Sequence, residues 1–306
     1  MANHTVSAPV AAAERLAHTR LGLFTAPEAY AVGVTPELLN HHSRPGGRWR
    51  RVLPRVYELA GQPPDRRRPP LAALLWAGPR AVLSHHTAAR ILRLDGALPG
   101  RRELWAPRGH APEGITLHRG VVPPEDVART GMLLHTTLDR TVRDLAHILD
   151  DETLELVVES VLRRRPGWRA DLDGGSRQGA ARLQRVLARR PPGAPATESE
   201  LETRYLQAVR TVGLPAPTRQ HRVVDDRGIC LGRLDLCWPD AGLWVELDGR
   251  AYHEQPKALL HDRRRQNELA IRLQWQPLRF TWEDVVHHPN ATARTTWLAY
   301  QRRLAG

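Results

Sequence analysis

The sequence predicts an α+β N-terminal half that contains a winged helix-turn-helix, followed by a C-terminal α/β domain with a mixed central sheet. Three observations predict this class. The first 61 residues have the order helix, helix, helix, hairpin. A segment rich in Pro and Gly at 189–196 separates two regions of different pattern. Two alternating runs within 233–248 read as neighbouring strands between helical patterns.

The charge of the chain indicates a polyanionic partner. The 306 residues carry a formal net charge of +12, and Lys257 is the only lysine, so the basicity comes from arginine. Such a surface raises encounter with phosphate backbones without fixing sequence specificity. A GC-rich genome would also enrich Arg, Ala, Gly and Pro, so the charge indicates nucleic acid only as a class.

The cysteine count and the lack of apolar segments indicate the compartment. The two cysteines, Cys230 and Cys237, form neither a CxxC pair nor a Cys/His zinc spacing, so we expect a reducing cytoplasm and no structural zinc. The N-terminus lacks the pattern of a signal peptide, and no run of 18 uncharged apolar residues occurs. The sequence therefore predicts a cytoplasmic protein with no membrane partner.

The boundaries of the N-terminal helices and strands can be predicted from capping and turn residues. Thr35 stands as an N-cap directly before Pro36, which is favoured at the first helical position. The runs 49–53 and 55–59 are rich in β-formers and meet around Pro54, as in a hairpin. The expected helices are 13–22, 25–33 and 34–43.

A winged helix-turn-helix reads DNA with its third helix and contacts phosphates with its wing. The candidate DNA-binding residues are therefore Asn40 and His41 in the third helix and Arg44 just after it, with Arg48, Arg50 and Arg51 in the wing. The alternative is a small helical module that packs on its neighbour and exposes its arginines to solvent.

Residues 66–188 read as an α+β continuation in which no catalytic pattern is evident. Apolar positions at helical spacing predict helices at 71–78, 84–94, 136–149, 150–165 and 180–190. Alternating runs predict strands at 103–107 and 114–120. The expected domains are 1–65, 66–188 and 197–306, with 189–196 as the linker.

Three strings in this region carry a family resemblance. After the predicted winged helix, "LSHHTAARILRL", "GITLHRG" and "TTLDRTVRDLAHIL" follow in order. Together they resemble the AbiEi-type antitoxins of abortive-infection toxin–antitoxin systems, over about the first 165 residues. The resemblance implies a DNA-binding repressor of its own operon, with operator DNA and a cognate toxin as partners.

Three carboxylates lie inside two apolar runs of the C-terminal half. A turn at 239–242 would pair Trp238 with Leu243, and counting outward sets Asp235 opposite Glu246. Asp248 lies two residues further along the same face. A loop of three or five residues would shift this pairing by one.

Facing carboxylates repel one another, so the arrangement needs a cation. Arg233, Arg250 and Arg265 are near enough in sequence to serve as ion-pair partners. The other choice is Mg²⁺ or Mn²⁺, which bind hard oxygens and can activate water for attack on a phosphodiester. No organic cofactor is indicated.

The flanking elements complete a second resemblance. The strings "SELE", "RQ", "RLDL", "VELDGRAYH", "DRRRQNELA" and "LRFTWEDV" occur in this order, and 197–290 resembles the very-short-patch-repair-like branch of the PD-(D/E)XK nucleases. The resemblance implies a restriction-endonuclease-like fold. Glu202 matches the helix glutamate, and Asp235 and Glu246 match the metal-binding acids. His253, Asp262 and Arg265 match further polar positions, with His253 catalytic and Arg265 against DNA.

Asp248 departs from this family, because it stands where a lysine usually orients the attacking water. As a third metal-binding and catalytic acid, Asp248 would need His253 or a second ion to replace that lysine, or the domain only binds DNA. We therefore expect a DNA-binding protein with a divalent-metal-dependent endonuclease domain, a hydrolase of phosphodiesters. The alternative is a non-enzymatic repressor or antitoxin of a toxin–antitoxin or phage-defence system, and RNA as the substrate stays open.

Overall fold

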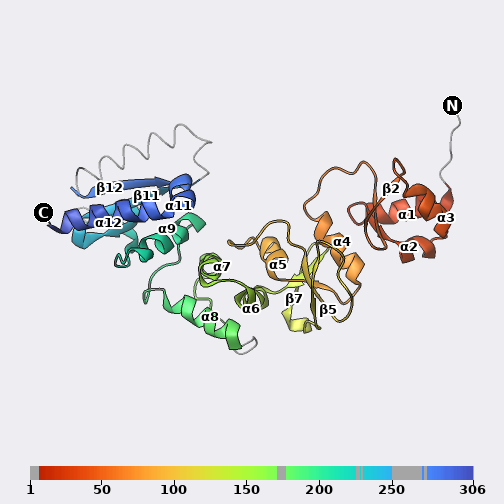
Figure 1. Ribbon diagram of the computed structural model, residues 1–306, viewed down its shortest axis with the longest axis horizontal. Coiled ribbons are helices and arrows are strands. Elements are labelled where there is room, and N and C mark those ends of the chain that lie inside the picture. Colours follow the sequence, from red (N-terminus) through yellow and green to blue (C-terminus); the bar gives the residue numbers. More distant parts are fainter. Residues whose placement is uncertain are drawn as a thin grey trace. The chain divides into compact units, whose positions relative to one another are not determined.

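A computed structural model describes residues 7–170, 177–224, 228, 230–249, 271 and 274–305. These residues form a mixed α and β structure, and their strands make up three sheets (Figure 1). The described residues form two compact units. The first unit contains the described residues up to Ile148 together with 177–180, and the second unit contains the rest. Within the described ranges, no helix combines the length and the apolar character needed to cross a lipid bilayer.

The first unit begins with three helices and three strands. They are α1 (Ala8–His18), β1 (Leu23–Thr25), α2 (Ala26–Ala31), α3 (Pro36–His42), β2 (Trp49–Leu53) and β3 (Val56–Leu59). The strands form an antiparallel sheet in the order β1-β3-β2. The three predicted helices and the hairpin are confirmed, although α1 begins at Ala8, five residues before its predicted start. Strand β1 was not predicted, because three residues are too few to show alternation.

Local chemistry explains these boundaries. Thr25 and Glu28 form a capping box at the start of α2. Thr35 accepts a hydrogen bond from the backbone of Leu38 and caps α3, with Pro36 at its first position. In β2, Trp49 and Leu53 are buried. Arg50 and Arg51 between them are exposed, whereas all four residues of β3 are buried, so the hairpin packs against two core clusters.

The remainder of the first unit surrounds a mixed five-stranded sheet in the order β6-β5-β4-β8-β7. Its elements are α4 (Arg68–Ala77), β4 (Val82–Leu83), α5 (His85–Ile91), β5 (Glu103–Ala106), β6 (Thr116–Arg119), β7 (Val127–Thr130), β8 (Leu133–Thr136) and α6 (Leu138–Ile148). The pairs β5–β6 and β4–β8 are parallel. The predicted helices and strands are present, but β4, β7 and β8 were not predicted.

Much of the string "LSHHTAARILRL" is buried in the interior of this unit. The side chains of Ser84, His85 and Thr87 are buried. Ser84 Oγ lies 2.8 Å from His85 Nδ1, and Thr87 Oγ1 donates to the carbonyl of Arg101 at 2.9 Å. Burial first, and His118 second, lower the pKa of His85 to about 2, so its imidazole is neutral at pH 7. These polar residues are therefore packed and bonded within the fold.

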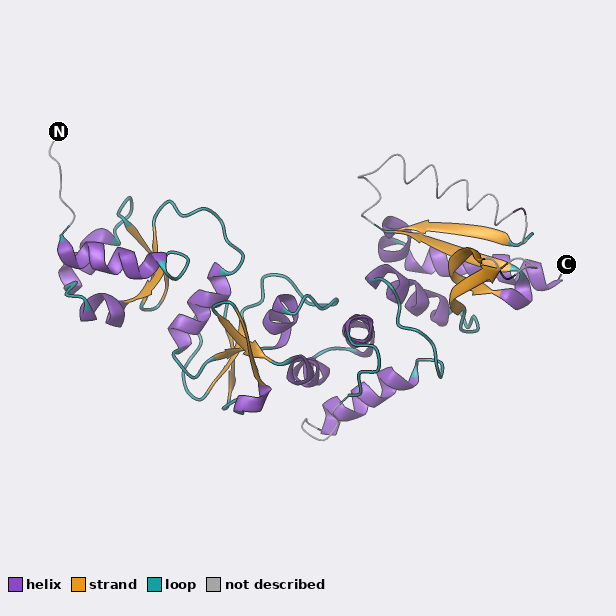
Figure 2. Cartoon of the chain, turned by 180° about the vertical axis from the view of Figure 1, so that it is seen from behind, coloured by secondary structure: helices purple, strands orange, loops and turns teal. Residues whose placement is uncertain are grey.

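In the part of the second unit that the structure describes, helices cover a four-stranded sheet. Its elements are α7 (Asp151–Arg164), the part of α8 (Arg177–Ala188) that follows residue 180, α9 (Glu200–Thr211), β9 (Thr218–Val224), β10 (Cys230–Trp238), β11 (Leu243–Asp248), β12 (Gln276–Thr281), α11 (Trp282–His287) and α12 (Pro289–Ala305). The strand order is β12-β11-β10-β9, with β11 and β12 parallel and the other pairs antiparallel. Figures 1 and 2 show α9, α11 and α12 along one face of this sheet. The mixed sheet predicted for the C-terminal half is therefore present.

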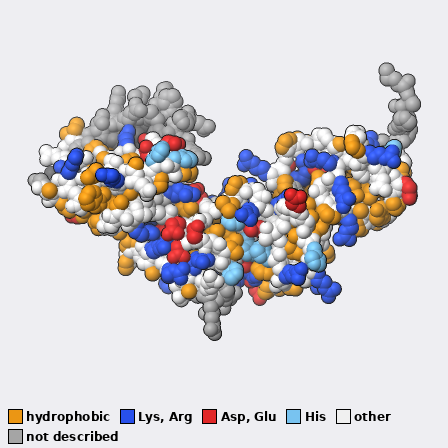
Figure 3. All heavy atoms as spheres, viewed as in Figure 1, with side chains coloured by type: hydrophobic (Ala, Val, Ile, Leu, Met, Phe, Trp, Pro, Cys, Tyr) orange, Lys and Arg blue, Asp and Glu red, His pale blue; other side chains and the backbone are white. Residues whose placement is uncertain are grey.

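Helix α7 carries a row of carboxylates, Asp151, Glu155 and Glu159, spaced by four residues and therefore on one face. We call this row the acidic stripe. Asp151 binds Arg185 at 3.0 Å and Glu155 binds Arg210 at 2.7 Å. Figure 3 shows acidic and basic side chains interleaved on the surface around α8. The stripe thereby joins α7 to α8 and α9.

The third member of the stripe is the most buried. Glu159, 1% exposed, contacts Arg190 at 2.5 Å and Arg219 at 3.2 Å. Its other oxygen accepts a hydrogen bond from the backbone of Thr197 at 2.9 Å. Residues 189–196, predicted as the linker, thus lie inside the second unit between two groups that bind Glu159.

We expect Glu159→Ala to lower the free energy of unfolding of the second unit by about 3–5 kcal/mol, because it leaves the guanidinium of Arg219 buried without its partner. The matched control is Glu152→Ala on the same helix. Its side chain is 64% exposed, and the expected change is within about 0.5 kcal/mol. Urea unfolding followed by circular dichroism measures both, and equal losses would contradict the assignment.

Candidate functional site

The hairpin β10–β11 has the register that its turn predicts. Trp238 pairs with Leu243, and Leu236 pairs with Val245. The connecting loop runs from Pro239 to Gly242, which has φ +55°. This left-handed conformation favours glycine, whereas the nearest contact of an added Cβ, 2.7 Å from the guanidinium of Arg303, is with the end of a flexible side chain. Continuing this register outward by one residue places Asp235 across from Glu246.

Helix α9 brings a fourth carboxylate to this hairpin. Ser199 caps the helix by accepting a hydrogen bond from the backbone of Glu202. The Glu202 side chain is only 4% exposed. Its Oε2 accepts hydrogen bonds from the backbone of Glu198 at 2.9 Å and from the amide of Gln220 at 3.4 Å. Glu202 is therefore fixed by the residue before its helix and by β9.

The carboxylates influence one another across three elements. Burial first, and then the charges of Asp235 and Glu198, raise the pKa of Glu202 to about 7. Burial likewise raises the pKa of Asp235, and the charges of Glu198 and Asp248 raise it further against the bond from the backbone of Leu247. We call Glu198, Glu202, Asp235 and Asp248 the acid cluster.

The other predicted site residues of this unit lie on β11 or outside the described ranges. Glu246 and Asp248 are half-buried on β11, opposite Arg279 and Thr281 of the parallel strand β12. His253, Asp262 and Arg265 lie outside the described residues. The described part of the predicted site is therefore Glu202 with the acids of the β10–β11 hairpin.

The acid cluster offers hard oxygen ligands to a divalent ion. Within the described part of the chain, no three His, Cys, Asp or Glu side chains are grouped closely enough to hold a metal ion. Mg²⁺, however, commonly takes only one or two protein carboxylates and fills its other positions with water and substrate phosphate. Glu202 and Asp235 supply hard oxygen donors whose raised pKa values a cation would lower. The described acids therefore fit an ion held by two carboxylates, and no larger set.

The two residues of the motif "RQ", Arg219 and Gln220, contact different carboxylates, which the sequence alone does not indicate. The Arg219 side chain is buried on Glu159, whereas that of Gln220 reaches Glu202. Gln220 has φ +54°, which is strained for a residue with a side chain, and its Oε1 is buried without a hydrogen bond from any described group. Strand β9 carries both residues and was not predicted, because its first five residues are all polar and show no alternation with apolar ones.

Glu159 and Glu202 are linked through neighbouring residues. Glu159 binds the backbone of Thr197 and the side chain of Arg219. The next residue of each segment, Glu198 and Gln220, donates to Glu202. The end of the acidic stripe therefore sets the position of α9 against β9 next to the acid cluster.

The predicted DNA-binding residues of the first unit lie around α3 and β2. Asn40, His41, Arg44 and Arg51 are exposed. Arg48 makes two hydrogen bonds to Glu14, at 2.7 and 2.9 Å. Arg50 binds the buried Glu58 at 2.9 Å while its own side chain stays 72% exposed. Two of the three wing arginines are therefore oriented by carboxylates.

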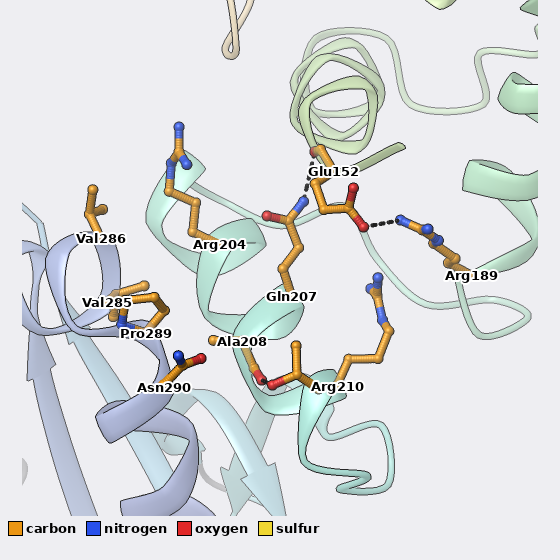
Figure 4. Close-up of a pocket in the computed structure, with 11 residues that line it drawn as sticks. Glu152, Arg189, Arg204, Gln207, Ala208, Arg210, Val285, Val286, Pro289 and Asn290 are labelled. Atoms are coloured by element: carbon orange, nitrogen blue, oxygen red, sulfur yellow. Dashed lines mark hydrogen bonds and ion pairs between the residues drawn. The ribbon is translucent and has the colours of Figure 1, made fainter. Parts of the chain in front are cut away.

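The second unit also contains a cavity of about 490 Å³ between α7, α9 and the start of α12 (Figure 4). Three arginines line it, but each already binds a carboxylate. Arg189 lies 3.1 Å from Asp151, Arg204 lies 2.7 Å from Glu200 and Arg210 lies 2.7 Å from Glu155. These ion pairs leave little positive charge for an anion.

No protein-family model matches this chain, and a search of curated proteins finds no match to it.

We expect Glu202→Gln to raise the stability of the second unit at pH 8 but not at pH 4. The folded pKa of about 7 exceeds that of an unfolded glutamate, so the neutral form is favoured by folding. The protonated Glu202 contributes its full stabilisation of the folded state below pH 4.5, and this stabilisation is lost as pH rises through 7. The loss is on the order of 3 kcal/mol. Thermal unfolding from pH 4 to pH 8 measures the difference. The control, Glu283→Gln, changes a side chain that is 69% exposed and should leave the profile unaltered; a wild-type profile in Glu202→Gln would refute the assignment.

Proposed function

We propose that the second unit is a divalent-metal-dependent phosphodiesterase that cleaves DNA, as the resemblance to the very-short-patch-repair-like PD-(D/E)XK nucleases implies. The observation that carries this proposal is the burial of Glu202 beside Asp235, from a helix and a strand far apart in sequence. A buried acid next to a half-buried one, both with raised pKa values, is costly for a structural role alone, and such pairs are frequent at functional sites.

The order of elements supports this assignment. Helix α9 with its glutamate precedes the antiparallel strands β9, β10 and β11, and β12 then joins parallel to β11. This is the order that the motif strings of the family imply. Strand β12 and the capping box of α11, formed by Thr281 and Asp284, carry the string "LRFTWEDV".

The chemistry would be divided among few groups. When bound, Mg²⁺ or Mn²⁺ supplies charge for the phosphate and an acidified water. Asp235 would hold the ion together with one carboxylate of β11, either Glu246 or Asp248, because the described acids form no set of three. Glu202, with its pKa near 7, can hold or release a proton at neutral pH, which suits general acid–base catalysis. Asp248 cannot replace a lysine as a cation. In its protonated form, Glu202 could instead donate a hydrogen bond or a proton at the site.

We propose further that the first unit binds duplex DNA as a winged helix. The order helix, strand, helix, helix, strand, strand, with sheet order β1-β3-β2, supports this assignment. The exposed Asn40 and His41 on α3 would meet base edges, and the arginines of β2 would meet phosphates. Arg265 would add a phosphate contact from the second unit.

Two observations favour a second candidate, a non-enzymatic repressor or antitoxin. Asp248 occupies the lysine position, and the described acids form no set of three metal ligands. In that case the acid cluster is a remnant in a binding platform, and operator DNA and a cognate toxin are the partners.

We expect wild-type protein to bind Mn²⁺ and to cleave DNA with Mg²⁺ or Mn²⁺, and Asp235→Asn to lose both. Calorimetry measures ion binding without a known substrate, and circular dichroism checks the fold. Affinity should rise as pH increases from 6 to 8, because the ion competes with the proton on Glu202. The control, Glu283→Gln, should behave as wild type. Wild-type protein that binds no ion and cleaves neither single-stranded nor mismatched DNA would favour the repressor, and cleavage of RNA alone would change the substrate.

We expect Arg51→Gln to weaken DNA binding equally for all sequences and to lower the slope of log K against log salt by about 0.9, the value for one phosphate contact. Fluorescence anisotropy on a duplex between 50 and 200 mM salt measures this slope. Arg15→Gln, on the exposed side of α1, is the matched control. Equal effects of the two changes would remove β2 from the DNA interface.

A further inference from the structure

The first unit contains a cavity of about 500 Å³ beside the β2–β3 hairpin. Its walls come from β2, from the segment that leads into α4, and from Arg102 just before β5. The volume lies within the range of small-molecule sites, about 300–1,000 Å³. None of its lining residues belongs to α3, but Arg50 of β2 is also one of the predicted DNA-binding residues.

The floor of the cavity is apolar. Leu23 and Leu53 are buried there, and Val52 and Ala72 lie beside them. Two prolines, Pro64 and Pro69, complete the apolar lining. Such a floor would bury the flat body of a small molecule and release water from it.

The rim is strongly basic. Four arginines line the cavity, Arg50, Arg66, Arg68 and Arg102, against two carboxylates, Glu58 and Asp65. Glu58, which is buried, accepts hydrogen bonds from both Arg50 and Arg68 at 2.9 Å. One carboxylate between two guanidiniums leaves one positive charge in excess.

The second carboxylate is neutralised from outside the cavity. Arg67, which is not part of the lining, donates three side-chain hydrogen bonds to Asp65 and lowers the pKa of that carboxyl to about 2. No described carboxylate pairs with Arg66 or Arg102, and the Nε of Arg102 donates to the carbonyl of Gly114 at 3.0 Å. Five guanidiniums and two carboxylates thus leave an excess of three positive charges around an apolar floor.

The geometry points to a binding site for a nucleoside monophosphate, with its base on the apolar floor and its phosphate between Arg66 and Arg102. A terminal phosphate carries close to two negative charges at pH 7 and accepts paired hydrogen bonds from guanidinium groups. Burying it here offsets the repulsion among the arginines. This contrasts with the cavity of the second unit, in which every arginine already binds a carboxylate.

The test is calorimetry of the full chain with AMP, with adenosine and with inorganic phosphate. We expect AMP to bind with a dissociation constant on the order of 10–100 μM and each fragment at least about tenfold more weakly, because each engages only the floor or only the rim. The diester TpT, which has no terminal phosphate, is the fourth probe. Equal binding of TpT would show that the cavity takes the DNA backbone, and absence of AMP binding at 1 mM would exclude the site.

Substitutions assign the contact to this cavity. Arg66→Gln and Arg102→Gln should each weaken AMP binding about tenfold or more, as expected for the loss of one charge-assisted hydrogen bond. Arg80→Gln, an exposed arginine of the same unit outside the cavity, is the control and should leave AMP binding unchanged. Arg66 is exposed, so its substitution keeps the test independent of any loss of folding from Arg102→Gln. AMP binding that survives both substitutions would overturn the proposal.

Discussion

The second unit depends on one buried carboxylate, Glu159 of α7. It takes the guanidiniums of Arg190 and Arg219 and the backbone of Thr197, and so joins a helix, a strand and the start of another helix. A buried ion is tolerated only when its partners and hydrogen bonds are complete, as they are here. Because the residues next to Thr197 and Arg219 hold Glu202, the same contact determines where the acid cluster lies. Both the stability of the second unit and the geometry of the acid cluster therefore depend on Glu159.

The acid cluster is electrostatically unfavourable, because its carboxylates are desolvated and repel one another. Glu202 is almost fully buried, and its neighbours are the charges of Asp235 and Glu198, so its pKa rises to about 7. Hydrogen bonds from Glu198 and Gln220 recover only part of the cost. A site of this kind is stabilised by whatever positive charge enters it, whether a proton, a metal ion or a guanidinium. That preference is the physical basis on which we favour the nuclease over a purely structural role.

The sequence predicted what is local and periodic. The helix at Thr35–Pro36, the β2–β3 hairpin and the pairing of Trp238 with Leu243 all follow from caps, turns and alternation, and the structure has them. Short strands such as β1 and β4 left no periodic signal. The partners of charged residues were also hidden, because Arg219 and Glu159 are far apart in the chain and only the fold brings them together. Candidate acids could be listed from the sequence, but not the burial that gives Glu202 its altered pKa.

The parallel pairing of β11 with β12 bears on how the protein reaches this state. The β10–β11 hairpin closes through a four-residue turn and can form early, whereas β12 must join from a distant part of the chain, since parallel strands need a crossover connection. Loop-closure entropy makes such pairing slow. Until it is complete, the apolar edge of β11 stays open to any other strand, which is the condition under which nascent chains aggregate. Synthesis of this protein at high concentration should therefore place a demand on chaperones that its native stability would not suggest.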